Sequence, residues 1–421
     1  MWYRLAKVLL LGAALGGLCL PVQSNTTVSP AGARSALPSS VVSSVSPVSP
    51  VSSFSPAPLR IAQTDLSIPP PAFEFPSTTP PARIALLLPL RSGPLLQAAE
   101  AVRAGFLAAW EREREGVTVD VIETGDAPQD ILATYAEAAA QHDIVVGPLS
   151  RSGVTALAQG NAISRPTIAL TQPELPTEGE LKLPQQLLVI GLSIEDEARQ
   201  AANWAATDKK VGKAFVIATA TAWQRRAAHA FAAQWQQKGK EAEIIELTAS
   251  SGYLEAKGLS ELKGRLQSDQ PAVLFVALDA RQARQVRAAA GRELPLYGTS
   301  QLNPLALSDW ETAERTGDLD GARFFDMPWQ LQSDHPAVMS YAHAEAGAEQ
   351  KRSADLERLY ALGIDAWRVA QAVAAKNNSF ELDGVTGKLT VRFGQGAPSF
   401  VRVQQQAVYR QGGVAPVANR R

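Results

Sequence analysis

The sequence predicts an α/β protein with two lobes, each built around a parallel β-sheet whose strands are joined by helices. Short apolar runs typical of buried strands alternate with amphipathic helical patterns from residue 82 to residue 298. The connections between them are short, as in right-handed βαβ units. After residue 298 the alternation stops, and the remaining patterns are those of a long helix and an antiparallel pair of strands.

The first unit is a strand, a loop and a helix. The run Ile84–Leu88 is uninterrupted and apolar, which indicates a strand buried on both faces. After the loop Leu90–Pro94, apolar residues recur every three or four positions, namely Leu95, Ala99, Val102, Phe106 and Trp110. They predict a helix with one face against the sheet. Ligands of open α/β sheets bind beyond the carboxyl ends of strands, so this loop is a first place to expect a function.

The same alternation continues through two runs. For the first lobe we expect strands at 117–124, 144–147, 167–170 and 187–191, and helices at 131–141 and 152–159. The second run opens at Ser193, which suits a helix N-cap and is followed by Glu195, Asp196 and Glu197 in the first turn. For this lobe we expect strands at 214–218, 243–247, 272–278 and 295–298, and helices at 222–238, 254–267 and 281–290.

The carboxyl-terminal part is expected to return to the two lobes. Residues 322–329 form a strand or a crossing segment, and Asp355–Lys376 form an amphipathic helix. Gly363 inside this helix costs about 0.5–1 kcal/mol relative to alanine, which predicts a close backbone contact there. Residues 384–393 and 400–409 are expected to pair as antiparallel strands.

A chain that leaves one lobe, builds a second and returns has the topology of two-lobed periplasmic binding proteins, which close by hinge motion. The predicted body is 82–411. Its first lobe comprises about 82–192 and 326–383, and its second lobe about 193–325 and 384–411.

The amino terminus predicts export. Arg4 and Lys7 precede an apolar stretch of about thirteen residues, too short to span a bilayer and typical of a signal peptide, here 1–24. Cleavage after Ser24 would release a soluble protein. Alternatively, Cys19 is lipidated, although Leu18 stands where a lipoprotein signal has Gly, Ala or Ser. Residues 25–81 are rich in Ser and Pro and predict a disordered linker that spans about 40–45 Å as a random coil.

Composition and motifs exclude several functions. A formal charge of −1 provides no basic field for nucleic acid, and a single cysteine permits no intramolecular disulfide. Neither GxxxxGK[ST] nor GxSxG is present, and the four histidines are scattered. We therefore expect no catalytic residues, no metal and no cofactor, and a membrane contact only if Cys19 is lipidated. An enzyme stays an alternative, because catalytic groups can converge from distant loops.

Candidate cleft residues follow the predicted strand ends. They are Ser92, Gly93, Ser150, Thr171, Gln172, Thr219, Trp223, Asp279 and Ser300. Ser150 would lie at a helix amino terminus, where it could help to bind an anion or simply cap the helix. Trp223 and Trp329 could be anchors for a ligand or partner, or core residues. Trp329 follows a proline at the expected crossing between lobes.

Several stretches together resemble the carboxyl-terminal domain of the penicillin-binding-protein activator family of the LppC or LpoA type. They are IALLLPL at 84–90, VVGPLSRSGVTAL at 145–157, GLSIEDEARQAANWA at 191–205, LYGTSQLN at 296–303, DLDGARFFDMPW at 318–329, RLYALGIDAW at 358–367 and GVTGKL at 384–389. The resemblance covers about 82–411. Longer members carry a helical-repeat domain ahead of this one, whereas 25–81 is expected to be only a linker.

The resemblance implies a type I periplasmic-binding-protein fold and a non-enzymatic partner of a class A penicillin-binding protein that stimulates peptidoglycan synthesis in the periplasm. Arg358, Asp365 and Trp367 belong to its signature and could hold lobe to lobe. The alternative is a receptor that hands a small ligand, such as an amino acid, to an ABC transporter. Such a receptor needs a charge clamp, and only Arg91, Arg151 and Asp279 lie near the expected cleft.

Overall fold

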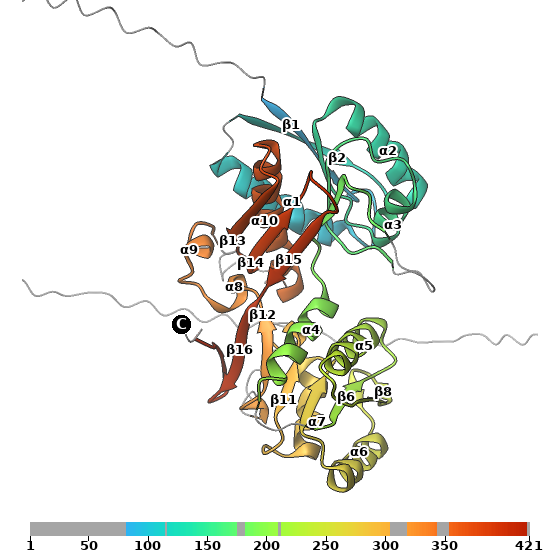
Figure 1. Ribbon diagram of the computed structural model, residues 1–421, viewed down its shortest axis with the longest axis vertical. Coiled ribbons are helices and arrows are strands. Elements are labelled where there is room, and N and C mark those ends of the chain that lie inside the picture. The colour runs from blue at the N-terminus through green and yellow to red at the C-terminus, as the bar shows by residue number, and fades with distance from the viewer. Residues whose placement is uncertain are drawn as a thin grey trace, which may run out of the picture. The chain divides into compact units, whose positions relative to one another are not determined.

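The computed structural model describes residues 81–113, 116–174, 182–208, 212–303, 318–342 and 353–418. The expected signal peptide lies outside these residues, as does the expected linker apart from Pro81. The described elements belong to one compact unit, Glu74–Arg421, and form two lobes with parallel sheets, which confirms the predicted fold class (Figure 1). Among the described residues, no helix is both long enough and apolar enough to cross a membrane.

The first lobe is built on a five-stranded parallel sheet of order β2-β1-β3-β4-β5. Its strands are β1 (Ala82–Leu88), β2 (Val117–Glu123), β3 (Ile144–Val146), β4 (Thr167–Ala169) and β5 (Leu187–Val189). The helices of this segment are α1 (Leu96–Arg112), α2 (Pro128–Gln141) and α3 (Arg151–Gln159). Alternate side chains of β1 enter two different apolar clusters, one containing α1 residues and the other α2 residues. This two-sided burial explains the uninterrupted apolar run.

The second lobe has a seven-stranded sheet of order β17-β16-β12-β11-β10-β6-β7. Its strands are β6 (Ala214–Ala218), β7 (Ala242–Glu246), β10 (Val273–Val276), β11 (Leu296–Gly298), β12 (Arg323–Asp326), β16 (Gln405–Arg410) and β17 (Gly413–Pro416). The helical elements of this lobe are α4 (Ile194–Ala205), α5 (Ala222–Gln237), α6 (Ala256–Asp269), α7 (Ala280–Ala290) and the short 3₁₀ helix η1 (Ser300–Leu302). A small hairpin of β8 (Ala249–Ser250) and β9 (Tyr253–Leu254) was not predicted, because two-residue strands leave no periodicity in a sequence.

Later segments complete the first lobe. They are α8 (Pro328–Leu331), α9 (Pro336–Met339), α10 (Ala354–Ala374) and an antiparallel sheet of β13 (Ser379–Asp383), β14 (Lys388–Arg392) and β15 (Ser399–Val403). Helix α10 packs closely on α1. A Cβ atom built on Gly363 would lie 2.2 Å from the carbonyl oxygen of Val102, and one on Gly105 would lie 1.9 Å from that of Tyr360. The close backbone contact predicted at Gly363 is therefore confirmed.

One expected boundary between the lobes is wrong. Residues 384–403 were assigned to the second lobe, but β14 pairs with β13 and with β15, and the side chains of Leu389 and Val391 pack in the core of the first lobe. The antiparallel pairing is present as β14 with β15. The following strand, β16, instead pairs with β12 in the second lobe. The chain therefore crosses between lobes near residues 190–193, 326–328 and 403–405.

Candidate functional site

A cavity of about 360 Å³ lies where the two lobes meet, and we call it the interlobe cavity. The first lobe and its crossing contribute Arg151, Leu192, Asp355, Arg358 and Leu359, and the second contributes Glu195, Glu197, Trp223, Arg226 and Ser300. Glu195 and Glu197 come from the first turn of α4, and Asp355 comes from the first turn of α10. Ser193 caps this helix as predicted, since its Oγ accepts a hydrogen bond of 3.1 Å from the Asp196 N–H.

Arg358 ties the lobes together from the wall of this cavity. Its guanidinium donates to Asp326 at 2.8 Å, to Asp355 at 2.9 Å and to the carbonyl oxygen of Ser300 at 3.1 Å. Burial works to lower the pKa of Arg358, but the neighbouring carboxylates, Asp326 foremost, more than offset it and raise the pKa above its ordinary value. The buried cation and carboxylate therefore hold α10 against β12 and the loop after β11.

Glu197 links α4 to the loop after β11 and to the third crossing. Its carboxylate accepts hydrogen bonds from the Ser300 N–H at 2.8 Å and from Gln404 Nε2 at 3.1 Å. Burial raises the pKa of Glu197 to about 7, although both of these donors act in the opposite direction. The amide oxygen of Gln404 is buried and has no hydrogen-bond partner among the described residues.

Arg402 fastens the third crossing to the first. It donates to the carbonyl oxygens of Ile190 at 2.7 Å and Gly191 at 3.1 Å, and to Thr386 Oγ1 at 3.0 Å. Burial lowers the pKa of Arg402 to about 10. Asp365 accepts 2.6 Å and 2.8 Å hydrogen bonds from the hydroxyl and N–H of Thr386. These contacts give Arg358 and Asp365 structural roles near the crossings, whereas Trp367 packs in the core of the first lobe.

Most charged side chains of the interlobe cavity are paired within the protein. Arg226 donates to Glu195 at 2.7 Å, and Arg358 is held by aspartates, so most charges are already paired within the protein. Arg151 differs, because its guanidinium donates to a carbonyl oxygen, that of Pro173, at 3.0 Å. In the described ranges, no group of three His, Cys, Asp or Glu side chains could hold a metal ion.

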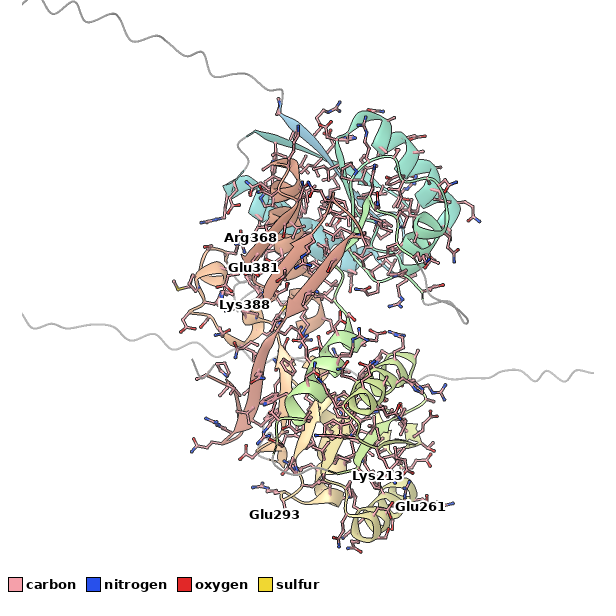
Figure 2. All side chains as sticks on the ribbon, viewed as in Figure 1. Lys213, Glu261, Glu293, Arg368, Glu381 and Lys388 are labelled. Atoms are coloured by element: carbon pink, nitrogen blue, oxygen red, sulfur yellow. The ribbon has the colours of Figure 1, made fainter. Side chains whose placement is uncertain are left out.

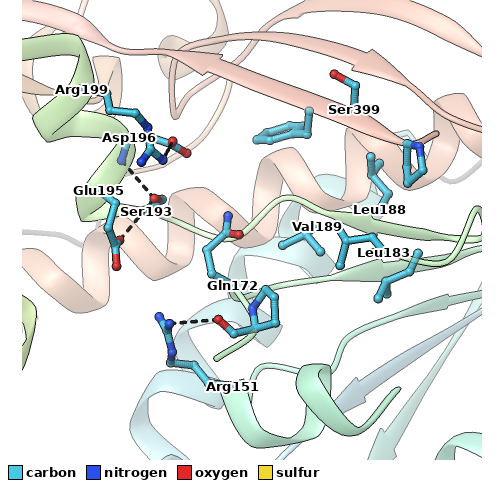
Figure 3. Close-up of a pocket in the computed structure, with 14 residues that line it drawn as sticks. Arg151, Gln172, Leu183, Leu188, Val189, Ser193, Glu195, Asp196, Arg199 and Ser399 are labelled. Carbon is cyan, nitrogen blue, oxygen red and sulfur yellow. Dashed lines mark hydrogen bonds and ion pairs between the residues drawn. The ribbon is translucent and has the colours of Figure 1, made fainter. Parts of the chain in front are cut away.

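The predicted site residues do not gather in one place. Trp223 and Ser300 line the interlobe cavity, whereas Gln172 lines a second cavity of about 450 Å³, which we call the edge groove. Figure 3 shows Gln172 there with Arg151 below it, Ser399 across it and the start of α4 beside it.

Other predicted residues have local structural roles. Ser150 caps α3 by accepting from the Gly153 N–H at 3.4 Å, and Asp279 caps α7 through the Gln282 N–H at 2.8 Å. Ser92 donates to Asp126 at 2.9 Å, and Thr219 donates to Gln224 at 2.7 Å. Thr171 packs its backbone against Gly191, and Gly93 is exposed with no atom near the position of a Cβ.

Of the two alternatives for Trp329, an anchor or a core residue, the structure supports the core residue. Its side chain is only 3% exposed, packs in the core of the first lobe, and donates from Nε1 to Glu357 at 2.9 Å. Trp329 belongs to α8, which places its ring against α10, with the ring centroid 5.4 Å from that of Tyr360. A proline before a tryptophan does not reveal which side of the chain is covered.

Sequence reasoning missed Glu197 and Asp326 as hinge residues. Asp326 is fully buried and also accepts from Asn303 at 2.8 Å. Glu197 was expected only as one of three acidic residues in the first turn of α4. A buried carboxylate has no signature in a single sequence, because its burial depends on segments such as 300–302 and 404 that lie far away.

The fold and the hinge together define a two-lobed, type I periplasmic-binding-protein-like body. The family model described as "LppC putative lipoprotein" matches residues 73–396, more than half of the chain. The chain belongs to this family.

Individual relatives agree with this assignment. "Penicillin-binding protein activator LpoA" of Pasteurella multocida is 30% identical over 315 residues, which cover 73% of this chain and 51% of that protein. A solved "putative branched-chain amino acid ABC transporter" from Chromobacterium violaceum is 31% identical with a TM-score of 0.61, and covers 78% of this chain and 100% of that one. The LpoA C-domain of Haemophilus influenzae, at 24% identity and a TM-score of 0.63, covers 80% and 100% and shows the fold. The chain spans about half the length of the curated relatives it matches.

Proposed function

We propose that this protein is a non-enzymatic regulator that binds and activates a class A penicillin-binding protein during peptidoglycan synthesis. The observation that carries the proposal is membership of the LppC family over residues 73–396, because relatives at 26–30% identity are named penicillin-binding protein activators. The site of action would be the periplasm, reached through the signal peptide 1–24. Lipidation of Cys19 would attach the protein to the outer membrane.

The charges of the interlobe cavity support a protein partner over a transported amino acid. An amino-acid receptor needs a carboxylate for the ammonium group and a cation for the carboxylate, both ready for the ligand. Here Glu195 is paired with Arg226, and Asp355 with Arg358. A ligand would have to break these ion pairs before it could form its own.

The direct test measures glycan polymerisation and peptide cross-linking by the class A synthase of the same organism, with and without the purified protein. Faster synthesis, together with binding at micromolar concentration or below, is the expected result. Binding without any change in either rate would contradict the activator role. Peptide cross-linking by a monofunctional transpeptidase is the matched control, and its rate should be unaffected.

A second candidate is a receptor for a small ligand such as an amino acid. The 31% identity to the structure named a branched-chain amino acid ABC transporter favours it, as does a cavity that presents Arg151 beside the half-buried Trp223. A receptor should melt several degrees higher with millimolar leucine, isoleucine or valine, because ligand binding to the folded state raises its stability. An unchanged melting temperature with all amino acids would remove this candidate.

A further inference from the structure

The five-stranded sheet of the first lobe has one open edge. β2 is an end strand in the order β2-β1-β3-β4-β5, and it pairs with β1 in unbroken register over its whole length. In the described ranges, no strand pairs with its other edge. The strand at the opposite end, β5, is covered, since Leu187 and Val189 are 0% and 7% exposed. The free edge of an end strand carries backbone groups that can pair with an added strand.

The outward backbone groups of β2 can be assigned from its hydrogen bonds to β1. The Ala82 N–H donates to the carbonyl oxygen of Gly116 at 3.0 Å, and the Thr124 N–H donates to that of Leu88 at 2.9 Å. Even-numbered residues of β2 therefore direct their backbone groups to β1, and odd-numbered residues direct theirs to the open edge. Among the described residues, no backbone hydrogen bond reaches the outward groups at the middle and end of the strand. The residues that carry these groups are Val119, Val121 and Glu123.

Side-chain exposure agrees with an edge that is open at the middle and end of β2. Val121 is 36% exposed and Glu123 is exposed, while Val119 is half-buried. At the start of the strand, Trp110 of α1 donates from Nε1 to the carbonyl oxygen of Val117 at 3.3 Å, which closes that end. β2 contains no proline, lysine or bulge, which are features that commonly protect an edge strand.

The charges of β2 restrict what can lie beside it. The Asp120 carboxylate lies 2.9 Å from His142 Nε2 and 3.7 Å from the Arg83 guanidinium, which offsets its charge within the monomer. Glu123 is the other charged residue of the strand. Like charges directly opposite each other destabilise a strand pair, so a partner strand must place no acidic residue opposite Asp120 or Glu123.

A second copy of β2 meets this condition in one register. When two antiparallel copies are related by a twofold axis at Val121, each Val121 lies opposite its symmetry mate, and Val119 lies opposite Glu123 of the second copy. Asp120 lies opposite Ile122 of the second copy on the other face. The outward residues of both strands then exchange N–H···O=C bonds, about six in all. No acidic residue lies opposite another.

Charge and access disfavour the neighbouring registers. An axis at Asp120 would place this carboxylate opposite that of the second copy. An axis at Val119 would pair Val117, whose carbonyl oxygen already accepts from Trp110. An axis at Ile122 would leave Val119 without a partner inside the strand of the second copy. The twofold register defined above is therefore favoured.

We propose that this protein forms a dimer in which the β2 strands of two copies pair antiparallel around a twofold axis at Val121, so that two five-stranded sheets become one. The contact lies away from the interlobe cavity and the edge groove, since no residue of β2 lines either of them. We expect a dissociation constant on the order of 100 µM, because pairing along one short edge buries less surface than a standard interface.

Sedimentation equilibrium of the purified protein tests the dimer. Between micromolar and millimolar concentration it should show a monomer–dimer equilibrium. Val121→Lys should weaken the dimer at least about tenfold, because it places two like charges on the axis. Val401→Lys is the matched control, since Val401 is 50% exposed on the end strand β15, and should change the dissociation constant less than twofold. A protein that stays monomeric up to millimolar concentration, or a dimer that both variants weaken equally, would overturn the proposal.

Cross-linking tests the register with milder substitutions. In a Cys19→Ser background, Val121→Cys should be cross-linked by a short bismaleimide, because the Cβ atoms of a directly opposed pair lie about 5 Å apart. Thr118→Cys is the control on the same strand. Its two copies are offset by about six residues in this register, or about 20 Å, and the reagent should not join them. Cross-linking of Thr118→Cys as efficient as that of Val121→Cys would overturn the register, even if Val121→Lys fails to fold.

Discussion

Replacing Glu197 with glutamine should remove a large part of the pH dependence of stability. The pKa of Glu197 is raised by burial from 4.5 to about 7, so between these values the folded protein retains a proton that the unfolded chain has lost. Stability then falls as the pH rises through this window. The difference of about 2.5 pH units corresponds to about 3 kcal/mol at 1.36 kcal/mol per unit.

The local geometry explains why glutamine should be accepted. Its amide oxygen can receive the Ser300 N–H, as the carboxylate does at 2.8 Å. Its NH₂ group can then donate to the amide oxygen of Gln404 if that amide turns over. Both hydrogen bonds of the carboxylate therefore have a counterpart in the variant.

The assay is urea denaturation at pH 5, 6, 7 and 8. The wild-type protein should lose most of the 3 kcal/mol between pH 5 and pH 8, and Glu197→Gln should lose little of it. Glu261→Gln on α6, where the glutamate side chain is 66% exposed, is the control and should follow the wild type (Figure 2). If Glu197→Gln kept the full wild-type slope, the assignment of the proton to this buried carboxylate would be refuted.

Three further substitutions test the packing of the first lobe and its hinge. Trp329→Ala should reduce the free energy of unfolding by about 3–5 kcal/mol, since the ring is in the core, and unchanged stability in urea would show that it is not. Gly363→Ala should destabilise by about 1–3 kcal/mol because its Cβ meets the α1 backbone, whereas Gly264→Ala on α6, with no atom within 4 Å, should raise the melting temperature. Arg358→Leu should cost about 3–5 kcal/mol by leaving Asp326 buried without its cation. The double replacement of both residues by leucine should recover much of this loss, and a double variant no better than the single would contradict the ion-pair argument.

Much of the fold follows from local patterns in the sequence. The uninterrupted apolar run at 84–88 predicted β1, and the apolar residues that recur every three or four positions after it predicted α1. A strand buried on both faces and a helix buried on one face leave these two different patterns. Gly363 indicated the contact between helices, because a glycine inside a helix is unfavourable unless the backbone approach requires it. Each of these features leaves a pattern within its own segment of the sequence.

The site was predicted less well, because its residues depend on contacts between distant segments. Ser150 and Asp279 follow strand ends, as ligand-binding residues do, but in this fold that position also demands helix caps. Nothing local distinguishes Glu197 from Glu195 in the first turn of α4. Glu197 nevertheless accepts a hydrogen bond from the Ser300 N–H, and Glu195 accepts one from Arg226. The boundary at 384 failed for a related reason, since an antiparallel pair can extend either lobe.

The three crossings have a consequence for the order in which the protein can fold during synthesis. Gln371 of α10 donates to the carbonyl oxygen of Glu113, 258 positions earlier in the chain, and α10 covers one side of the first sheet. A nascent chain that has completed β1 to β5 therefore still exposes an apolar face, and keeps it exposed while the whole second lobe is made. Truncation within α10, between residues 354 and 374, would not leave a smaller working lobe. It would leave part of an apolar face uncovered, which is a substrate for chaperones and proteases.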